Sequence, residues 1–211
     1  MKVIGLTGRE RVGKGTVAEM MIGHLREVDC YAKVEGFADR LKVSAARALG
    51  FDGDWDECVA LCDWLKVNGE VQVLNQTGKL HANLDPVSGR RFLQLYGTEA
   101  HREVFGDDFW TDAVLPPTFD REDCDVLIVH DVRFPNEAER VRDYPDGEVW
   151  EIVRPGFSDA PASHASQQRI EGDQVIVNNL GLEELCGAVA LALEPTVAYF
   201  QERQEVLEVP R

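Results

Sequence analysis

The residues with the clearest chemistry lie near the amino terminus, where residues 8–16 read GRERVGKGT. Gly8 and Gly13 allow a tight loop whose backbone N–H groups converge on an anion. A helix would begin at Lys14, and the positive end of its dipole also favours negative charge. The Lys14 ammonium suits β and γ phosphates, and the Thr16 hydroxyl suits a Mg²⁺ ion that bridges them. The segment therefore predicts a loop that binds a nucleoside triphosphate such as ATP.

One position departs from the commonest phosphate-loop pattern, which has Ser or Thr directly after Lys. Here Gly15 separates Lys14 from Thr16, and this GKGT order resembles the loop of nucleoside monophosphate kinases such as the adenylate kinases. The alternative is a glycine-rich turn that binds nothing, which the complete Gly, Lys and Thr set disfavours. The residues predicted to bind ATP are Gly8, Arg11, Val12, Gly13, Lys14, Gly15, Thr16 and Asn178.

A second chemical feature follows the most apolar segment of the chain, VLIVH at residues 126–130. Such a run predicts a buried strand, and Asp131 would stand at its carboxyl end. Because α/β sheets bind ligands at this edge, we expect Asp131 near the phosphates, where it would hold Mg²⁺ together with Thr16. The alternatives for Asp131 are a helix N-cap or an ordinary turn residue.

The elements that would position these residues alternate between strand and helix. Apolar runs predict strands at residues 2–6, about 32–37, 126–130, 148–153 and 174–178. Helical spacing predicts helices at residues 14–28, 39–49, 55–65, 90–105 (bent near Gly97), 135–142 and 182–193. Residues 71–84 suit a hairpin with its turn at Thr77-Gly78. This alternation predicts an α/β protein with three layers, in which helices flank a five-stranded, mostly parallel sheet.

The composition is typical of a soluble globular protein. The chain has 211 residues and a formal net charge of −16, which argues against general nucleic-acid binding, because such surfaces cluster Lys and Arg. The five cysteines lack metal-ligand spacing, although Cys58 and Cys62 would share a helix face. We see no secretory signal and no apolar segment of about 20 residues that would span a membrane. A single cytoplasmic domain, residues 1–211, is expected.

Four further segments resemble the phage-type deoxynucleoside monophosphate kinases: FADRLK at 37–42, RRFLQLYGTEAHR at 90–102, HDVRFPNEAE at 130–139 and SHAS at 163–166. The segment DQVIVNNLGLEEL at 173–185 is similar to the last strand and helix of many small-molecule P-loop kinases, including dephospho-coenzyme A kinases. The resemblance covers most of the chain outside residues 51–89 and the carboxyl-terminal tail. It implies a P-loop kinase fold with an acceptor-binding insertion at 40–105 and a short lid-like loop at 154–172.

The resemblance also implies an activity, the Mg²⁺-dependent transfer of the γ-phosphate of ATP to a deoxynucleoside 5′-monophosphate for DNA synthesis. Such transfer needs positive charge around the phosphoryl oxygens, which arginine can bind bidentately. The implied catalytic residues are Lys14, Asp39, Arg102 and Arg133. The implied acceptor-binding residues are Asp39, Lys42, Arg91, Gln94, Arg102, Asp131 and Arg133. For the arginines the alternative is surface ion pairing, and for Gln94 a solvated helix face.

Some positions depart from the family pattern. Arg40 stands where Pro is usual, which predicts a different local turn, and Gln167 stands where a Glu is expected, which argues against an acidic role for the lid-like loop. Arg154 and Arg169 flank that loop and would supply it with a cation. Asn178 would approach the adenine unless it caps the last helix.

Three other functions stay open. The first is a P-loop kinase of another small acceptor, such as dephospho-coenzyme A. The segments DVRFPNE and LQLYGTE argue against this function. The second is a P-loop NTPase that drives a partner, although no basic DNA patch is visible. The third is a kinase of DNA ends or bases, which the net charge of −16 disfavours. The sequence does not decide the base preference of the acceptor, and it allows a homodimer.

Overall fold

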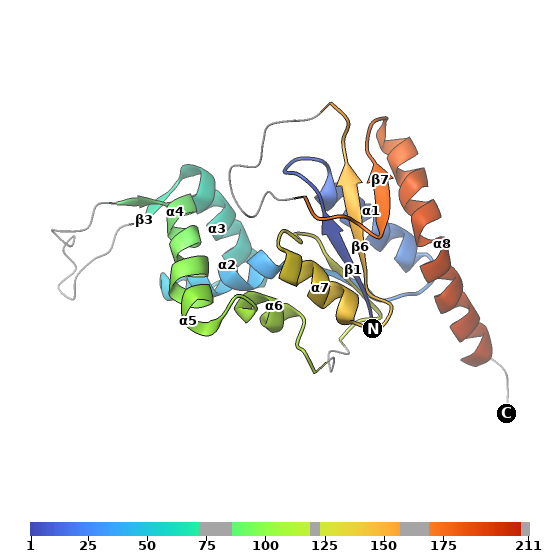
Figure 1. Ribbon diagram of the computed structural model, residues 1–211, viewed down its shortest axis with the longest axis horizontal. Helices are drawn as coiled ribbons and strands as arrows, with labels where there is room; N and C mark the ends of the chain where they lie inside the picture. The colour runs from blue at the N-terminus through green and yellow to red at the C-terminus, as the bar shows by residue number, and fades with distance from the viewer. Residues whose placement is uncertain (72–85, 119–122, 157–168, 208–211) are drawn as a thin grey trace. The chain divides into compact units, whose positions relative to one another are not determined.

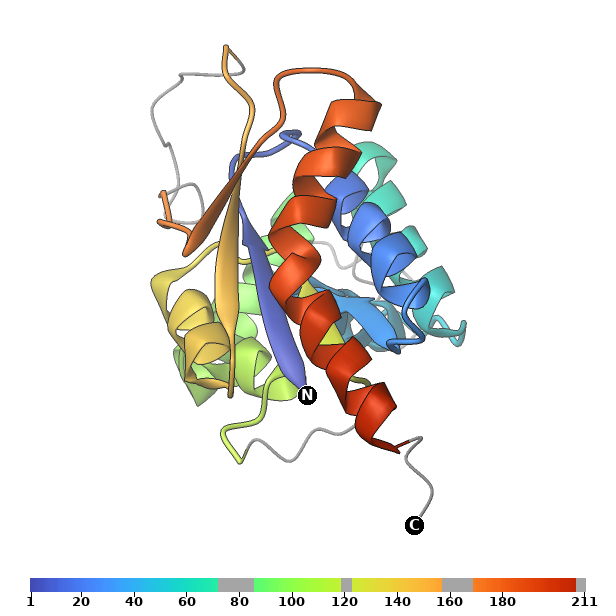
Figure 2. The same ribbon diagram turned by 90° about the vertical axis from the view of Figure 1, so that its right-hand side faces the viewer.

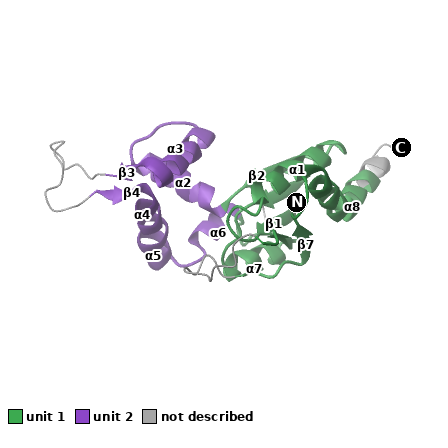
Figure 3. Ribbon diagram, turned by 90° about the horizontal axis from the view of Figure 1, so that it is seen from above, with its two compact units in different colours: residues 1–36, 115–211 green, residues 37–114 purple. Residues whose placement is uncertain are grey.

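The computed structural model describes residues 1–71, 86–118, 123–156 and 169–207, with side chains up to residue 202. The chain divides into two compact units (Figure 3). Unit 1 comprises Met1–Gly36 and Leu115–Arg211, and unit 2 comprises Phe37–Val114. Each unit has its own buried core. The phosphate loop belongs to unit 1, whereas the predicted acceptor insertion at residues 40–105 lies within unit 2.

Unit 1 is built on a five-stranded sheet in which every neighbouring pair of strands is parallel. From edge to edge the strands are β2 (Ala32–Glu35), β5 (Val126–Val129), β1 (Lys2–Thr7), β6 (Glu148–Val153) and β7 (Gln174–Val177). Figure 1 shows β1, β6 and β7 side by side. The three central strands are apolar and largely buried, as strands covered on both faces must be. All five predicted strands are confirmed.

Helices cover both faces of this sheet, with α1 (Lys14–Arg26) and α8 (Leu182–Leu207) on one face and α7 (Pro135–Asp143) on the other (Figure 2). The pleat of β1 explains the division, because successive side chains of a strand point to opposite faces. Ile4 and Leu6 enter the core that α1 and α8 share with the sheet. Gly5, between them, faces Val132 in the turn before α7 and Val141 within α7. The predicted three-layer α/β fold is therefore confirmed.

The last helix runs further than its sequence pattern predicted. It was expected to end at residue 193 but continues through Pro195 to Leu207. Proline disturbs a helix interior because it lacks an N–H group. The helix nevertheless continues, since Leu193, Thr196 and Phe200 follow at helical spacing and are all buried. No helix in the described part of the chain is long and apolar enough to cross a membrane.

Unit 2 is mostly helical. Its elements are α2 (Phe37–Ala48), α3 (Trp55–Asn68), β3 (Glu70–Val71), β4 (Val87–Ser88), α4 (Gly89–Gln94), η1 (Leu95–Arg102), α5 (Glu103–Phe105) and α6 (Phe109–Val114). The core of this unit forms around Ala45, Ala46, Cys58 and Cys62, so the two cysteines share a buried helix face as their spacing predicted. β3 and β4 pair antiparallel, and the turn predicted at Thr77-Gly78 lies outside the described residues.

The bend predicted near Gly97 is a π-helix, η1. Gly97 has no room for a side chain, because a Cβ there would collide with Leu41. Its carbonyl accepts a hydrogen bond from Trp110 Nε1 at 3.0 Å, and the Tyr96 carbonyl lies 2.6 Å from His101 Nδ1. Side chains that bind helix carbonyls disturb the regular α-helical pattern, which favours the wider π turn.

A pair of glycine substitutions tests the packing of α7 on β1. A Cβ at Gly5 would lie 2.9 Å from Val132 Cγ2 and 3.1 Å from Val141 Cγ2, and overpacking a core costs about 1–3 kcal/mol. We expect Gly5→Ala to lower the free energy of unfolding by about this amount in urea denaturation. The matched control is Gly23→Ala in α1, where the added Cβ meets no atom within 4 Å and helix propensity predicts a gain of about 0.5–1 kcal/mol. Wild-type stability of Gly5→Ala would contradict this packing.

Candidate functional site

The phosphate loop connects β1 to α1 in a conformation that requires glycine. Gly8 and Gly13 have φ angles of 132° and 104°, which residues with a Cβ rarely adopt. Space is also short, because a Cβ at Gly8 would collide with the carbonyl of Ile152. A Cβ at Gly13 would lie 2.6 Å from Asn178 Nδ2. The ends of β6 and β7 therefore fix the curve of the loop.

This curve leaves several backbone N–H groups available to a ligand. The first hydrogen bond of α1 runs from Val17 N–H to the Gly13 carbonyl, at 2.9 Å. Among the described residues, no backbone carbonyl or capping side chain accepts from the N–H groups of residues 13–16. N–H groups at the positive end of a helix dipole form an anion site. The loop is thus suited to bind phosphate oxygens.

Lys14 supplies a cation at the same place. Its Nζ donates hydrogen bonds to the carbonyls of Gly8 and Arg9, at 2.7 and 2.8 Å. Burial, followed by repulsion from Arg133, lowers the pKa of Lys14 to about 8, although Asp131 acts in the opposite direction. A phosphate beside Lys14 would offset both the burial and the repulsion. The ammonium is therefore placed where an anion stabilises it.

The turn after β5 brings Asp131 and Arg133 to this edge of the sheet. Asp131 is buried and Arg133 is exposed. Val132 N–H donates to the Leu6 carbonyl at 3.2 Å, which ties the turn to the end of β1. Both Asp131 and Arg133 act electrostatically on Lys14. Three residues that the sequence predicted for the site thus come together in unit 1.

Sequence reasoning missed Glu137, which holds this turn in place. Its side chain is buried, and Oε2 accepts hydrogen bonds from the N–H groups of Arg133 and Phe134, at 2.7 and 3.1 Å. Phe134 is the N-cap of α7, so Asp131 is not a helix cap. The available signal was a Glu three residues after an N-cap, a position from which its carboxylate reaches back to the helix start.

The two predicted Mg²⁺ ligands, Thr16 and Asp131, offer oxygen atoms of the kind that Mg²⁺ prefers. A Thr16 hydroxyl and an Asp131 carboxylate are hard ligands, and Mg²⁺ is commonly held by one or two carboxylates together with substrate phosphates and water. Nowhere in the described ranges do three or more His, Cys, Asp or Glu side chains form a group that could hold a metal. Phosphate oxygens would therefore have to complete a site at Thr16 and Asp131.

Several predicted acceptor residues of unit 2 form ion pairs. Lys42 Nζ lies 3.1 Å from both Asp39 Oδ1 and Asp63 Oδ2. Burial acts to lower the pKa of Lys42, but the two carboxylates raise it more, so that its pKa lies above the ordinary value. Arg91 pairs with Glu99 at 3.1 Å. Ion pairing was the alternative weighed for Arg91.

The remaining predicted residues of unit 2 lie at helix ends or within helices. Gln94 is the last residue of α4 and Arg102 is the last of η1. Arg40 lies within α2, and its guanidinium is 4.8 Å from the centre of the Trp55 ring. This position is therefore helical and packs on an aromatic ring.

Most of the predicted lid-like loop, residues 157–168, lies outside the described residues, and His164 and Gln167 with it. Arg169 follows this segment and forms a bidentate ion pair with Glu151, with Nε–Oε1 and Nη2–Oε2 distances of 2.9 and 3.2 Å. The Glu151 carboxylate is buried on β6, whereas the Arg169 side chain is 73% exposed. The predicted lid cation is thus joined to a carboxylate of the sheet.

Asn178 stands directly after β7 and was predicted to approach the adenine or to cap the last helix. Its Nδ2 donates a hydrogen bond of 2.8 Å to the Val12 carbonyl. The side chain therefore contacts the phosphate loop itself, through a partner that is 166 residues away in sequence.

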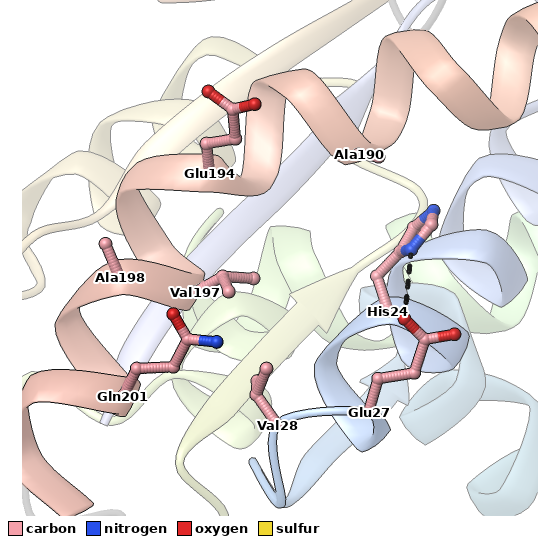
Figure 4. Close-up of a pocket in the computed structure, with 8 residues that line it drawn as sticks. All are labelled: His24, Glu27, Val28, Ala190, Glu194, Val197, Ala198 and Gln201. Atoms are coloured by element: carbon pink, nitrogen blue, oxygen red, sulfur yellow. Dashed lines mark ion pairs between the residues drawn. The ribbon is translucent and has the colours of Figure 1, made fainter. Parts of the chain in front are cut away.

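A separate groove lies between the end of α1 and α8 (Figure 4). It has a volume of about 470 Å³ and contains none of the predicted site residues. Its lining residues are His24, Glu27, Val28, Ala190, Glu194, Val197, Ala198 and Gln201. Since Glu27 and Glu194 line it without a Lys or Arg, the groove does not suit phosphate.

The fold and the loop define a P-loop α/β protein of the kinase type. A model of the deoxynucleotide monophosphate kinase family matches residues 57–189, more than half of the chain. The chain therefore belongs to the deoxynucleotide monophosphate kinase family. It is also 40% identical over 126 residues to deoxynucleoside-5′-monophosphate kinase of Escherichia phage T5. This match spans 53% of the chain and 49% of the relative, so the chain spans about half the length of the curated relative.

The lowered pKa of Lys14 predicts a pH dependence of nucleotide binding. Lys14 is charged below about pH 8 and loses its charge above it in the free protein. Because a bound phosphate favours the charged form, the dissociation constant of a non-hydrolysable ATP analogue should rise above pH 8, by up to about tenfold per pH unit. Calorimetric titrations from pH 7 to 9.5 measure this. Lys14→Met is the control and should bind weakly at every pH; the same pH dependence in that variant would contradict the assignment.

Proposed function

We propose that the chain transfers the γ-phosphate of ATP to a deoxynucleoside 5′-monophosphate, with Mg²⁺, and so makes deoxynucleoside diphosphates for DNA synthesis. One observation carries the proposal: a phosphate loop with available N–H groups and Lys14 beside Arg133, in a chain of the deoxynucleotide monophosphate kinase family. The name of the phage T5 relative supports the same reaction class.

In this proposal the donor nucleotide binds unit 1. Residues 8–16 hold the phosphates of ATP, and Lys14 binds the β and γ groups. Thr16 and Asp131 would hold Mg²⁺, which would offset the negative charge of the phosphates. Arg133 supplies positive charge to the transferring phosphoryl group. Since phosphoryl transfer asks little covalent chemistry of the protein, positioning and charge account for the rate.

The acceptor is proposed to bind residues of unit 2, within the insertion at 40–105. Arg91 and Arg102 would bind its 5′-phosphate, Asp39 and Lys42 would orient it, and Gln94 would reach its base. The loop at 154–172 would close over the phosphates and exclude water, which suppresses hydrolysis of ATP. The net charge of −16 favours such a small acceptor over a polynucleotide.

A coupled ADP-release assay tests the reaction. We expect release with ATP and Mg²⁺ to depend on one or more of the four deoxynucleoside monophosphates, and to fall at least about 100-fold in Lys14→Ala, which loses charge stabilisation of the transition state. Dephospho-coenzyme A serves as the competing acceptor. Steady release without any acceptor would identify an NTPase instead, and release with dephospho-coenzyme A alone would identify another small-molecule kinase.

A matched pair of arginine substitutions tests the role of Arg133. We expect Arg133→Ala to lower kcat by about 100-fold, since it removes charge from the transferring group. Arg26→Ala removes the same charge at the far end of α1, about 18 Å along the helix from Lys14, and should leave kcat unchanged. Equal effects of the two substitutions would show that net charge, rather than the position of Arg133, matters.

A further inference from the structure

Asn178 joins the last strand of the sheet to the phosphate loop. Its backbone N–H donates to the Val153 carbonyl at 2.7 Å, so the main chain continues the hydrogen bonding between β6 and β7. Its side-chain Nδ2 donates to the Val12 carbonyl at 2.8 Å. The residue is therefore anchored to the sheet on one side and bound to the loop on the other.

The contact reaches the peptide that links Val12 to Gly13. The Val12 side chain is buried, which fixes one end of this peptide in the core. At the other end, a Cβ on Gly13 would lie 2.6 Å from Asn178 Nδ2. The Asn178 amide thus occupies the space beside Gly13, which adds a steric reason for glycine to the φ angle of 104°.

The geometry of a peptide gives this contact a consequence for the ligand. In a planar trans peptide the C=O and N–H bonds point in opposite directions. Because Asn178 holds the Val12 carbonyl, it also sets the direction of the Gly13 N–H, which points away from Asn178. That N–H is one of the groups available to phosphate at the start of α1.

We propose that Asn178 is a positioning residue of the phosphate loop, which orients the Val12–Gly13 peptide for the polyphosphate of the donor nucleotide. The inference rests on the proposed function and deepens its donor site. It assigns Asn178 to the phosphates, whereas the sequence suggested the adenine.

Binding of inorganic tripolyphosphate tests this role, because the probe has phosphates and no base. We expect Asn178→Ala to weaken tripolyphosphate and ATP by the same factor, about tenfold for a lost orienting hydrogen bond. The ratio of ATP to GTP affinity should not change. Asn178→Asp should bind more weakly still, because it loses the donor and adds negative charge. The control is Asn179→Ala, an exposed neighbour whose substitution should leave tripolyphosphate binding unchanged.

A double-mutant cycle provides a second measurement. Gly13→Ala should weaken tripolyphosphate binding less in the Asn178→Ala background than in the wild type. The clash between the new Cβ and the Asn178 side chain is then absent, while the backbone strain at φ 104° is the same in both backgrounds. Wild-type tripolyphosphate affinity in Asn178→Ala, with a changed ATP to GTP ratio, would overturn the inference and leave the proposed function standing. Failure of the wild type to bind either ATP or tripolyphosphate would overturn both.

Discussion

Every strand of the five-stranded sheet of unit 1 runs in the same direction, and the arrangement of the site depends on this constraint. Parallel strands end at one edge, so segments that are far apart in sequence converge there. β1 ends in the phosphate loop, β5 ends in the turn of Asp131 and Arg133, and β7 ends at Asn178. β6 lies between β1 and β7 and contributes the Val153 carbonyl that binds the Asn178 N–H. The topology thus brings the predicted phosphate-binding residues to this edge.

The local charge around Lys14 is opposite in sign to the net charge of the whole chain. The chain carries a net charge of −16. Repulsion from Arg133 nevertheless lowers the pKa of Lys14 more than attraction to Asp131 raises it, and the pKa is about 8. Burial is the larger cause, so the loop holds a cation at a place that solvates it poorly. An anion that binds between Lys14 and Arg133 relieves both effects, whereas it would gain little from a well-solvated lysine. The unfavourable position of Lys14 in the free protein would therefore favour the binding of an anion beside it.

The sequence was sufficient for features whose cause is local. Apolar runs located all five strands, and the glycine, Lys14 and Thr16 pattern located the loop. The tertiary contacts of the site residues could not be predicted. Asn178 was identified as a site residue, but its partner Val12 lies on a distant strand-to-helix connection that no local pattern reveals. Lys42 was identified as a cation, but Asp63 comes from the next helix. The position of Glu137 near the start of a helix could be predicted from the sequence. Its hydrogen bond from the Arg133 N–H, however, depends on the conformation of the turn before α7.

The ion pairs of unit 2 distinguish Arg91 from Lys42, both of which the sequence had predicted to bind the acceptor. Arg91 and Glu99 are both about half exposed, and such a pair contributes only about 0–1 kcal/mol. Breaking the Arg91–Glu99 pair would therefore cost little. Lys42 and Asp39 are 14% and 11% exposed, whereas Asp63 is 51% exposed. Removing one partner of a buried pair such as Lys42–Asp39 costs about 3–5 kcal/mol. Of the two, Arg91 would therefore be the easier cation for an anion to recruit, and Lys42 is better suited to hold the Asp39 carboxylate in place.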